Sequence, residues 1–243
     1  CRHLAPVDDI SAERDDAAIP EKLRLSESLG VDASAPEELA STLASWWAAP
    51  PKGLRSVVGD GRDGPLELDL VKDGPHSLIA GTTGAGKSEF LQTLLVVLAA
   101  RYSPARVVFL LIDYGGGTAT KDLKLLPHTV GQLRNLDGGL AIRALARREA
   151  EIVRREQALA AHEARDLDEL RRIDPDNAPP SLVIAVDEFA FLKTEVPEFI
   201  PGIIDVAARG RKLGLHLILA TQRPEGAIHA DIAANVALRV ALR

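Results

Sequence analysis

One octapeptide in the first half of the chain constrains the whole architecture: Gly81-Thr82-Thr83-Gly84-Ala85-Gly86-Lys87-Ser88. It follows an apolar run at residues 77–80, which has the pattern of a strand, and it precedes an apolar helix pattern that extends from residue 90 to residue 100. The pattern G-x-x-x-x-G-K-S between a strand and a helix is that of a phosphate-binding loop. We therefore expect nucleotide phosphates to bind where this loop meets the helix.

The residue types of the loop suit the binding of ATP together with Mg²⁺. Glycines allow backbone N–H groups to turn toward phosphate oxygens, and the amino terminus of the following helix adds a partial positive charge. Lys87 is expected to contact the β- and γ-phosphates, and the hydroxyl of Ser88 to bind Mg²⁺. ATP and Mg²⁺ are thus the predicted ligands.

A second candidate element is an apolar strand at residues 181–186 that ends in two adjacent carboxylates, Asp187 and Glu188. Ligands of open α/β sheets bind at the carboxyl ends of the strands, so both carboxylates should face the phosphates. We predict that Asp187 holds Mg²⁺, directly or through water, and that Glu188 polarises the attacking water. The alternative is that the pair caps the following helix.

Further polar residues flank a strand expected at residues 215–220. Gln222 follows the carboxyl end of this strand. Its side-chain amide can sense the γ-phosphate and orient the attacking water, or the residue merely begins a loop. Arg209, Arg211 and Lys212 precede the strand, at the carboxyl end of an expected helix. These cations can favour the helix dipole, or one of the arginines can enter a neighbouring subunit's ATP site as an arginine finger.

The remaining pattern indicates an α/β fold with a mostly parallel sheet, helices on both faces and an amino-terminal helix and β-hairpin packed against it. After residue 76, short apolar runs alternate with helical segments. Strands are expected near residues 77–80, 106–112, 181–186, 215–220 and 236–242, and helices near residues 86–100, 138–163, 197–210 and 227–235. Residues 54–75 have the turn and the alternation of a β-hairpin.

Residues 1–53 are expected to form a leader with one helix at about residues 36–48. Trp46 and Trp47 on this helix pack it onto the main domain or form a partner-binding patch. The chain begins with Cys1 and ends in a strand pattern with no cap or tail after it. We interpret it as a piece of a longer protein whose carboxyl-terminal end is truncated.

Composition narrows the class of protein. Of the 243 residues, 46% are hydrophobic and only 4% aromatic, which favours helices packed on a sheet. The formal net charge of −6 argues against a nucleic-acid module that binds through bulk positive charge. A single cysteine excludes an internal disulfide and a multi-cysteine metal site. No apolar run approaches the length that spans a bilayer, and the first 20 residues are not a signal peptide.

Taken together, three pieces of sequence resemble the FtsK/SpoIIIE family of ring-forming motor ATPases. They are Asp73-Gly74-Pro75-His76 with the loop from Gly81 to Glu89, then Val186-Asp187-Glu188-Phe189, and finally Gly214-Leu215-His216-Leu217 with Ala220-Thr221-Gln222-Arg223-Pro224. The phosphate-binding loop and the Asp187-Glu188 pair alone are shared by many families, whereas the last piece is much more specific. The resemblance covers roughly residues 54–243, which we expect to be the ATPase domain.

Two branches of the family are most similar: the type VII (ESX) secretion ATPases and a set of actinobacterial FtsK/SpoIIIE-domain proteins often fused to FHA domains. The leader and Gly74-Pro75-His76 look like the secretion branch, and residues 207–214 look like both branches. Asp113, after the strand at residues 106–112, can approach the phosphate-binding loop or merely terminate the strand. The family usually has a lysine two residues after this aspartate, where the chain has Gly115, so the role of that lysine is not carried over.

The resemblance implies a RecA-like fold and hydrolysis of ATP coupled to the movement of a polymer. It also implies a ring, hexameric in the family, or a tandem of modules with ATP sites at the interfaces. A motor for protein export is favoured, with polypeptide as cargo. The alternatives are a DNA translocase and a nucleotide-dependent interaction module without motor activity. The implied location is the cytoplasmic part of a membrane-anchored bacterial protein, with membrane contact only through other parts of it.

Overall fold

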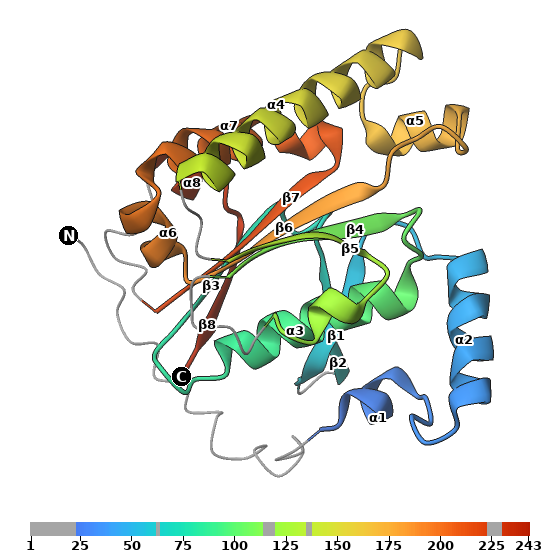
Figure 1. The fold of residues 1–243 in the computed structure, drawn as a ribbon. Coiled ribbons are helices and arrows are strands. Elements are labelled where there is room, and N and C mark those ends of the chain that lie inside the picture. Colours follow the sequence, from blue (N-terminus) through green and yellow to red (C-terminus); the bar gives the residue numbers. More distant parts are fainter. Residues whose placement is uncertain (1–22, 62–63, 114–119, 135–137, 223–229) are drawn as a thin grey trace, which may run out of the picture.

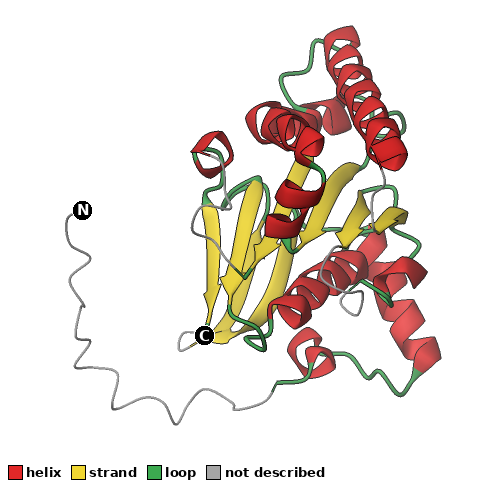
Figure 2. Ribbon diagram, turned by 60° about the vertical axis from the view of Figure 1, so that its left-hand side comes forward, coloured by secondary structure: helices red, strands yellow, loops and turns green. Residues whose placement is uncertain are grey.

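The computed structural model describes residues 23–61, 64–113, 120–134, 138–222 and 230–243. Cys1, Gly115, Arg223 and Pro224, on which parts of the predictions rest, lie outside these stretches. In the described part a central sheet has helices on both of its faces (Figures 1 and 2). The predicted fold class is thereby confirmed.

The central sheet has six strands in the order β5-β4-β6-β7-β3-β8, and every pairing is parallel. The strands are β3 (His76–Gly81), β4 (Val107–Asp113), β5 (Thr129–Arg134), β6 (Ser181–Asp187), β7 (Leu215–Thr221) and β8 (Leu238–Leu242). Because all six are parallel, their carboxyl ends lie at one edge of the sheet. The octapeptide after β3, the carboxylates at the end of β6 and Gln222 after β7 therefore meet at the same edge.

Both faces of the sheet are covered, so its central strands are apolar along their whole length rather than alternating. In β6, Val183 and Ala185 point into one core and Ile184 and Val186 into the other. The first core lies against α3 (Lys87–Arg101) and the amino-terminal hairpin. The second lies against the helices that follow α3 in the chain: α4 (Gly138–Ala161), α5 (Leu167–Ile173), α6 (Phe189–Glu195), α7 (Ile200–Leu213) and α8 (Ala230–Ala233). None of the helices in the described part of the chain is long and apolar enough to cross a membrane.

The amino-terminal appendage packs on α3. It consists of α1 (Leu25–Leu29), α2 (Pro36–Ala48) and the antiparallel hairpin of β1 (Arg55–Gly61) and β2 (Gly64–Asp69). The indole N–H of Trp47 lies 3.1 Å from the carbonyl oxygens of both Ala99 and Ala100, near the carboxyl end of α3. Trp46 lies under the guanidinium of Arg101 at 4.0 Å. Both tryptophans thus hold α2 on the helix that begins at the phosphate-binding loop.

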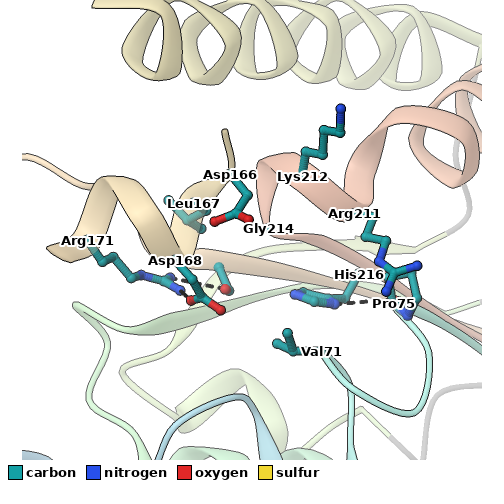
Figure 3. Close-up of a pocket in the computed structure, with 11 residues that line it drawn as sticks. Val71, Pro75, Asp166, Leu167, Asp168, Arg171, Arg211, Lys212, Gly214 and His216 are labelled. Carbon is teal, nitrogen blue, oxygen red and sulfur yellow. Dashed lines mark hydrogen bonds and ion pairs between the residues drawn. The ribbon is translucent and has the colours of Figure 1, made fainter. Parts of the chain in front are cut away.

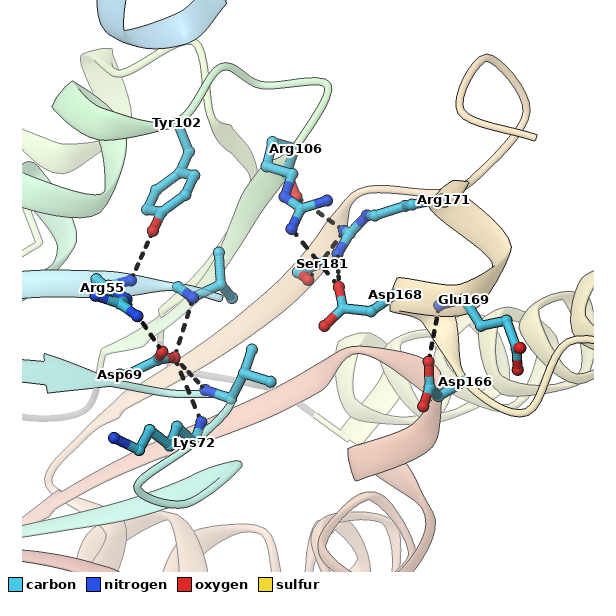
Figure 4. A network of polar contacts seen from close by, with 12 residues as sticks. Arg55, Asp69, Lys72, Tyr102, Arg106, Asp166, Asp168, Glu169, Arg171 and Ser181 are labelled. Carbon is cyan, nitrogen blue, oxygen red and sulfur yellow. Dashed lines mark hydrogen bonds and ion pairs between the residues drawn. The ribbon is translucent and has the colours of Figure 1, made fainter. Parts of the chain in front are cut away.

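A buried carboxylate joins the hairpin to the rest of the domain. Asp69 accepts hydrogen bonds from the backbone N–H groups of Leu54, Val71 and Lys72, at 3.1, 2.9 and 3.4 Å (Figure 4). The backbone N–H of Arg55 donates to the hydroxyl of Tyr102 at the end of α3, at 2.8 Å. These bonds satisfy backbone groups that a buried turn would otherwise leave unpaired.

Several elements differ from the expectation. The strand β5 and the helices α1, α5 and α6 were not predicted from the sequence. The expected helix at residues 227–235 is only the four-residue α8 in its described part, and its first three residues lie outside that part. In β5 the run Thr-Val-Gly-Gln-Leu-Arg contains a glycine and three polar residues, so it lacks the apolar pattern by which the inner strands were found.

Candidate nucleotide-binding site

The octapeptide forms the turn between β3 and α3. Gly84 and Gly86 have φ angles of 81° and 87°, in the left-handed region that other residues rarely adopt. A Cβ atom on Gly81 would lie 3.0 Å from the carbonyl oxygen of Leu242, so the loop is closely packed against β8. Helix α3 starts at Lys87, and its free N–H groups therefore face the loop. This geometry is suited to an anion.

Lys87 is buried, with 7% of its surface exposed. Its Nζ donates to the carbonyl oxygens of Gly81 and Thr82, at 2.8 and 3.0 Å. The ammonium group thus lies inside the loop, where a phosphate chain bound to the loop would meet it.

A hollow of about 300 Å³ lies beside the loop and brings most of the predicted site residues together. We call it the nucleotide hollow. Its lining comprises Thr83, Gly84, Gly86, Lys87, Ser88, Glu89, Asp187, Glu188 and Gln222. Gly81, Thr82 and Ala85 belong to the loop but do not line the hollow, and neither Arg209 nor Arg211 does.

Asp187, at the end of β6, is buried beside two other carboxylates. Burial, together with the neighbouring charges of Asp113 and Glu188, raises its pKa to about 6, although Lys87 acts in the opposite direction. A nearby cation would stabilise the ionised form of such a carboxyl group. Carboxylate and hydroxyl oxygens are ligands that Mg²⁺ prefers, so Asp187 and Ser88 fit this ion.

Asp113 ends β4 next to Asp187 and is buried at 3% exposure. The hydroxyl of Thr120 donates to its Oδ2 at 2.5 Å, and the Nε atom of Arg134 lies 3.9 Å away. Asp113 thus lies at the edge of the sheet that carries the nucleotide hollow but does not line it, and both interpretations of this residue stay predictions.

Glu188 lies at a turn with φ 63° and ψ 71°, in the left-handed region, immediately before α6. No side-chain capping bond to α6 is formed, so the alternative role of a helix cap is not supported. The carboxylate instead accepts from the hydroxyl of Thr221 at 3.1 Å and from the backbone N–H of Gln222 at 3.2 Å. Thr221 is a functional candidate that the sequence reasoning missed.

Gln222 connects two parts of the site. Its side-chain oxygen accepts a hydrogen bond of 2.7 Å from the hydroxyl of Thr83 in the phosphate-binding loop. Its backbone N–H is the donor to Glu188. The residue after β7 thus lies between the loop and the predicted general base.

The two candidate arginines lie at the opposite edge of the sheet, near the amino end of β7. A strand of seven residues is about 20 Å long, so neither guanidinium can reach the phosphate-binding loop of its own chain. Arg209 is held by Asp205 at 2.6 Å and by Glu156 of α4 at 3.0 Å. Arg209 is thus paired with one carboxylate on its own helix, α7, and with one on α4.

Arg211 is differently placed. It is exposed and has no hydrogen-bond or ion-pair partner among the residues that the structure describes. It lines a cavity of about 470 Å³ at the amino edge of the sheet, together with Pro75 and His216 (Figure 3). Of the two arginines, Arg211 is the one that is available to another molecule.

The two histidines of the Gly-Pro-His and Gly-Leu-His motifs are structural. His76 accepts from the backbone N–H of Leu217 at 3.1 Å, and Nδ1 of His216 lies 3.2 Å from the carbonyl oxygen of Pro75. Burial lowers the pKa of His76 to about 4, and burial together with the charge of His76 lowers that of His216 to about 3. The pair is therefore neutral and fastens the starts of β3 and β7 to each other.

The chain is similar in sequence and in fold to known proteins. The FtsK/SpoIIIE family profile matches residues 40–226. The type VII secretion system protein EssC of Staphylococcus aureus is 41% identical over 201 residues, which are 80% of this chain but 13% of EssC. The solved cytoplasmic domain of the type VII secretion ATPase EccC from Thermomonospora curvata has a TM-score of 0.81 and 33% identity, and the match covers 92% of this chain and 27% of that one.

A second solved structure is that of ATPases 2 and 3 of Thermomonospora curvata EccC in complex with a signal sequence peptide. It has a TM-score of 0.71 and 28% identity, over 78% of this chain and 36% of that one. The chain thus spans about an eighth of the length of EssC and about a quarter of the EccC domain. It is homologous to the ATPase domains of these secretion proteins.

Proposed function

We propose that this chain, which belongs to the FtsK/SpoIIIE family, is an ATP-hydrolysing motor module that drives polypeptide export in a type VII secretion-like system. One observation supports hydrolysis most directly. A lysine, a serine hydroxyl and two adjacent carboxylates converge on the nucleotide hollow. This is the set of groups that Mg²⁺-dependent hydrolysis of ATP uses.

Each of these residues has its own task in the proposed reaction. Lys87 neutralises the charge of the β- and γ-phosphates. Ser88 and Asp187 hold Mg²⁺, which supplies positive charge against the phosphate oxygens. Glu188 takes up the proton of the attacking water, and the carboxamide of Gln222 orients that water. The products are ADP and phosphate.

A second cavity supports a polypeptide as the cargo. It measures about 640 Å³ and lies between the outer half of the sheet and α7. Apolar side chains form most of its lining, among them Val108, Leu110, Val130, Leu133, Leu182, Ile184 and Phe199. Three arginines and one glutamate of α4 also line it, namely Arg147, Arg154, Arg155 and Glu151, and Glu151 is ion-paired to Arg154 and Arg155. An amphipathic peptide segment with acidic residues fits this combination. The net charge of −6 is unfavourable for gripping a duplex through its phosphates.

The module is proposed to work beside neighbouring ATPase modules, in a hexameric ring or in tandem, so that Arg211 of one module completes the site of the next. The relatives are cytoplasmic parts of secretion ATPases, and we propose the same location for this chain, with the membrane reached only through other parts of the full protein.

ATP turnover of the assembled protein tests the cargo. Duplex DNA is added at about 50 mM and at about 200 mM salt, the range over which binding to phosphates weakens sharply. In a parallel arm, an amphipathic acidic peptide of the signal-sequence type is added. We expect the peptide to stimulate turnover and DNA to leave it unchanged. Salt-sensitive DNA binding with stimulated turnover would instead make the chain a DNA translocase.

Two exposed apolar residues provide a matched pair of variants for the cavity. Val130 lines it with 63% of its surface exposed, whereas Leu125 is 76% exposed and lies outside its lining. Val130→Asp should weaken the response to the peptide, and Leu125→Asp should not. ATP binding without any turnover, in the assembled protein, would point to a nucleotide-dependent interaction module rather than a motor.

A further inference from the structure

The carboxylate of Glu188 is held by the end of a different strand. Glu188 follows β6, but its Oε1 accepts from the hydroxyl of Thr221, the last residue of β7, at 3.1 Å. Its Oε2 lies 3.2 Å from the backbone nitrogen of Gln222. Both Glu188 and Thr221 are buried, with 5% and 0% of their surfaces exposed. The direction of this carboxylate is therefore set by β7 and not by its own helix.

The same strand end is also fastened to the phosphate-binding loop. Thr83 donates its hydroxyl to the side-chain oxygen of Gln222 at 2.7 Å, the shortest bond of this group. The side chain of Gln222 thus contacts the loop, and the backbone N–H of Gln222 contacts the carboxylate of Glu188. A shift of Thr83 is passed to the Gln222 backbone, and from there to the carboxylate.

We propose that Thr221 and Thr83 are positioning residues for Glu188, one fixing the carboxylate on β7 and the other coupling it to the phosphate-binding loop. The inference rests on the proposed hydrolysis of ATP and concerns how the base of that reaction is aimed. A general base must lie within hydrogen-bond reach of the water whose proton it takes. The strained backbone of Glu188 does not fix its side chain, so the hydroxyl of Thr221 and the N–H of Gln222 do so.

The chemistry of threonine explains why this residue type stands at position 221. Its methyl group fills the buried end of β7, and its hydroxyl supplies the donor. Valine has the same shape but lacks the donor, whereas serine keeps the donor and loses the methyl group. The three residues therefore separate positioning from packing.

The test compares Thr221→Val, Thr221→Ser and Thr83→Val with the assembled wild-type protein. We expect Thr221→Val to lower kcat by roughly 10²-fold, as displacement of a catalytic group by about 1 Å does. Its affinity for ATP should stay within about twofold, because Glu188 acts after binding. Thr221→Ser should recover most of kcat. Thr83→Val should lower kcat, and adding it to Thr221→Val should cost little more, since both act through one carboxylate.

Amide hydrogen exchange supplies a readout that needs no turnover. The N–H of Gln222 is bonded to Glu188, and Gln222 is otherwise exposed. Without nucleotide, we expect its exchange to accelerate in Thr221→Val and in Thr83→Val. Thr129→Val is the matched control. Thr129 begins β5, away from the site, and its hydroxyl donates a hydrogen bond of 2.6 Å to the carbonyl oxygen of Leu123, which the variant removes. It should change neither kcat nor the exchange of Gln222.

The possible outcomes separate this inference from the proposed function. Absence of hydrolysis by the assembled wild type would reject the proposed function itself. If the wild type hydrolyses ATP and Thr221→Val has an unchanged or a higher kcat, Thr221 does not position the base. A loss in Thr221→Val that serine fails to restore would show that the position serves packing, and the inference would then be wrong.

Discussion

Asp113 and Asp187 are direct register partners on the neighbouring parallel strands β4 and β6, and both carboxylates are buried. Burial, together with the neighbouring carboxylate of Asp113, raises the pKa of Asp187 to about 6. A divalent cation at the end of β6 would relieve the repulsion between the two carboxylates. A metal ion at this edge of the sheet would therefore be favourable.

Replacement of Asp187 by asparagine should weaken the affinity of the site for Mg²⁺. The amide keeps the size of the side chain but has no charge to attract the ion. We expect the Mg²⁺ concentration for half-maximal turnover to rise by about 10–100-fold, the range found when the surroundings of a metal site are altered. A Mg²⁺ titration measures it, with Asp176→Asn on the surface as the control. An unchanged midpoint would remove Asp187 from the metal site.

Lys87→Ala should weaken the binding of ATP strongly. The Nζ of Lys87 lies inside the loop, and its charge-assisted hydrogen bonds to phosphate are worth about 1.5–3 kcal/mol, which corresponds to roughly 10–100-fold in affinity. Titration with labelled ATP gives the dissociation constant. Lys124→Ala, in the turn before β5, is the control for a lost surface charge. Equal affinities of Lys87→Ala and the wild type would contradict the assignment of the loop.

Glu188→Gln should separate binding from hydrolysis. The amide cannot take up the proton of the attacking water, and general base catalysis contributes about 10²–10⁴-fold to the rate. We expect kcat to fall by about this factor while labelled ATP still binds. Turnover near that of the wild type would mean that another residue is the base.

The residues of the nucleotide hollow were predictable because their chemistry dictates their type and order. Phosphate binding requires glycines and a lysine at fixed spacing, and so Lys87 and Ser88 were identified from the octapeptide alone. Asp187 and Glu188 were predicted because they follow an apolar strand, and ligands of open α/β sheets bind at the carboxyl ends of the strands. Local sequence was sufficient to predict those lining residues of the hollow that stand next to one another in the chain.

What the sequence could not show are contacts between residues far apart in the chain. The bond of Thr221 to Glu188 joins positions 33 apart, and that of Thr83 to Gln222 joins positions 139 apart. Neither partner reveals the other without the strand order. The same holds for Arg209, whose ion pair with Glu156 depends on the packing of α7 against α4. Edge strand β5 was missed because its glycine and three polar residues interrupt the apolar pattern.

Acid should destabilise the fold in part through His76. Its pKa falls from 6.5 to about 4 on folding because burial disfavours the charged ring, so the unfolded chain binds the proton more readily. The resulting stability is complete above about pH 6.5 and is lost as the pH falls toward 4, by about 3 kcal/mol for this group.

His76→Asn isolates this effect. Asparagine retains an acceptor for the N–H of Leu217 but does not titrate. The shift of Asp187, which has the opposite direction, is common to both proteins and cancels in the comparison. His216 loses the charge of His76 as a neighbour but stays buried, and burial is the larger cause of its lowered pKa. Urea unfolding between pH 7 and pH 4.5 should show a shallower pH dependence for the variant, and parallel curves would contradict the assignment to His76.

Arg211 should act on the ATP site of a neighbouring module. It is exposed, has no partner among the described residues, and lies near the amino end of β7, a strand about 20 Å long whose carboxyl end lies beside the phosphate-binding loop. An arginine finger is worth roughly 10³–10⁵ in rate, so Arg211→Ala assemblies should be nearly inactive and the isolated module weakly active. Arg209→Ala should have a much smaller effect, because Arg209 is engaged by Asp205 and Glu156.

Mixed assemblies decide whether Arg211 acts across the interface. In an equal mixture of Arg211→Ala and Lys87→Ala modules, about one interface in four pairs an intact Lys87 with an intact Arg211 of its neighbour, if the modules assemble head to tail at random. Turnover should therefore reappear, although each variant alone is inactive. It should scale with the product of the two fractions as the mixing ratio is varied. If mixtures that are shown to assemble stay inactive at every ratio, Arg211 does not complete a neighbour's site. In that case its position at the amino-edge cavity serves assembly or the dipole of α7 instead.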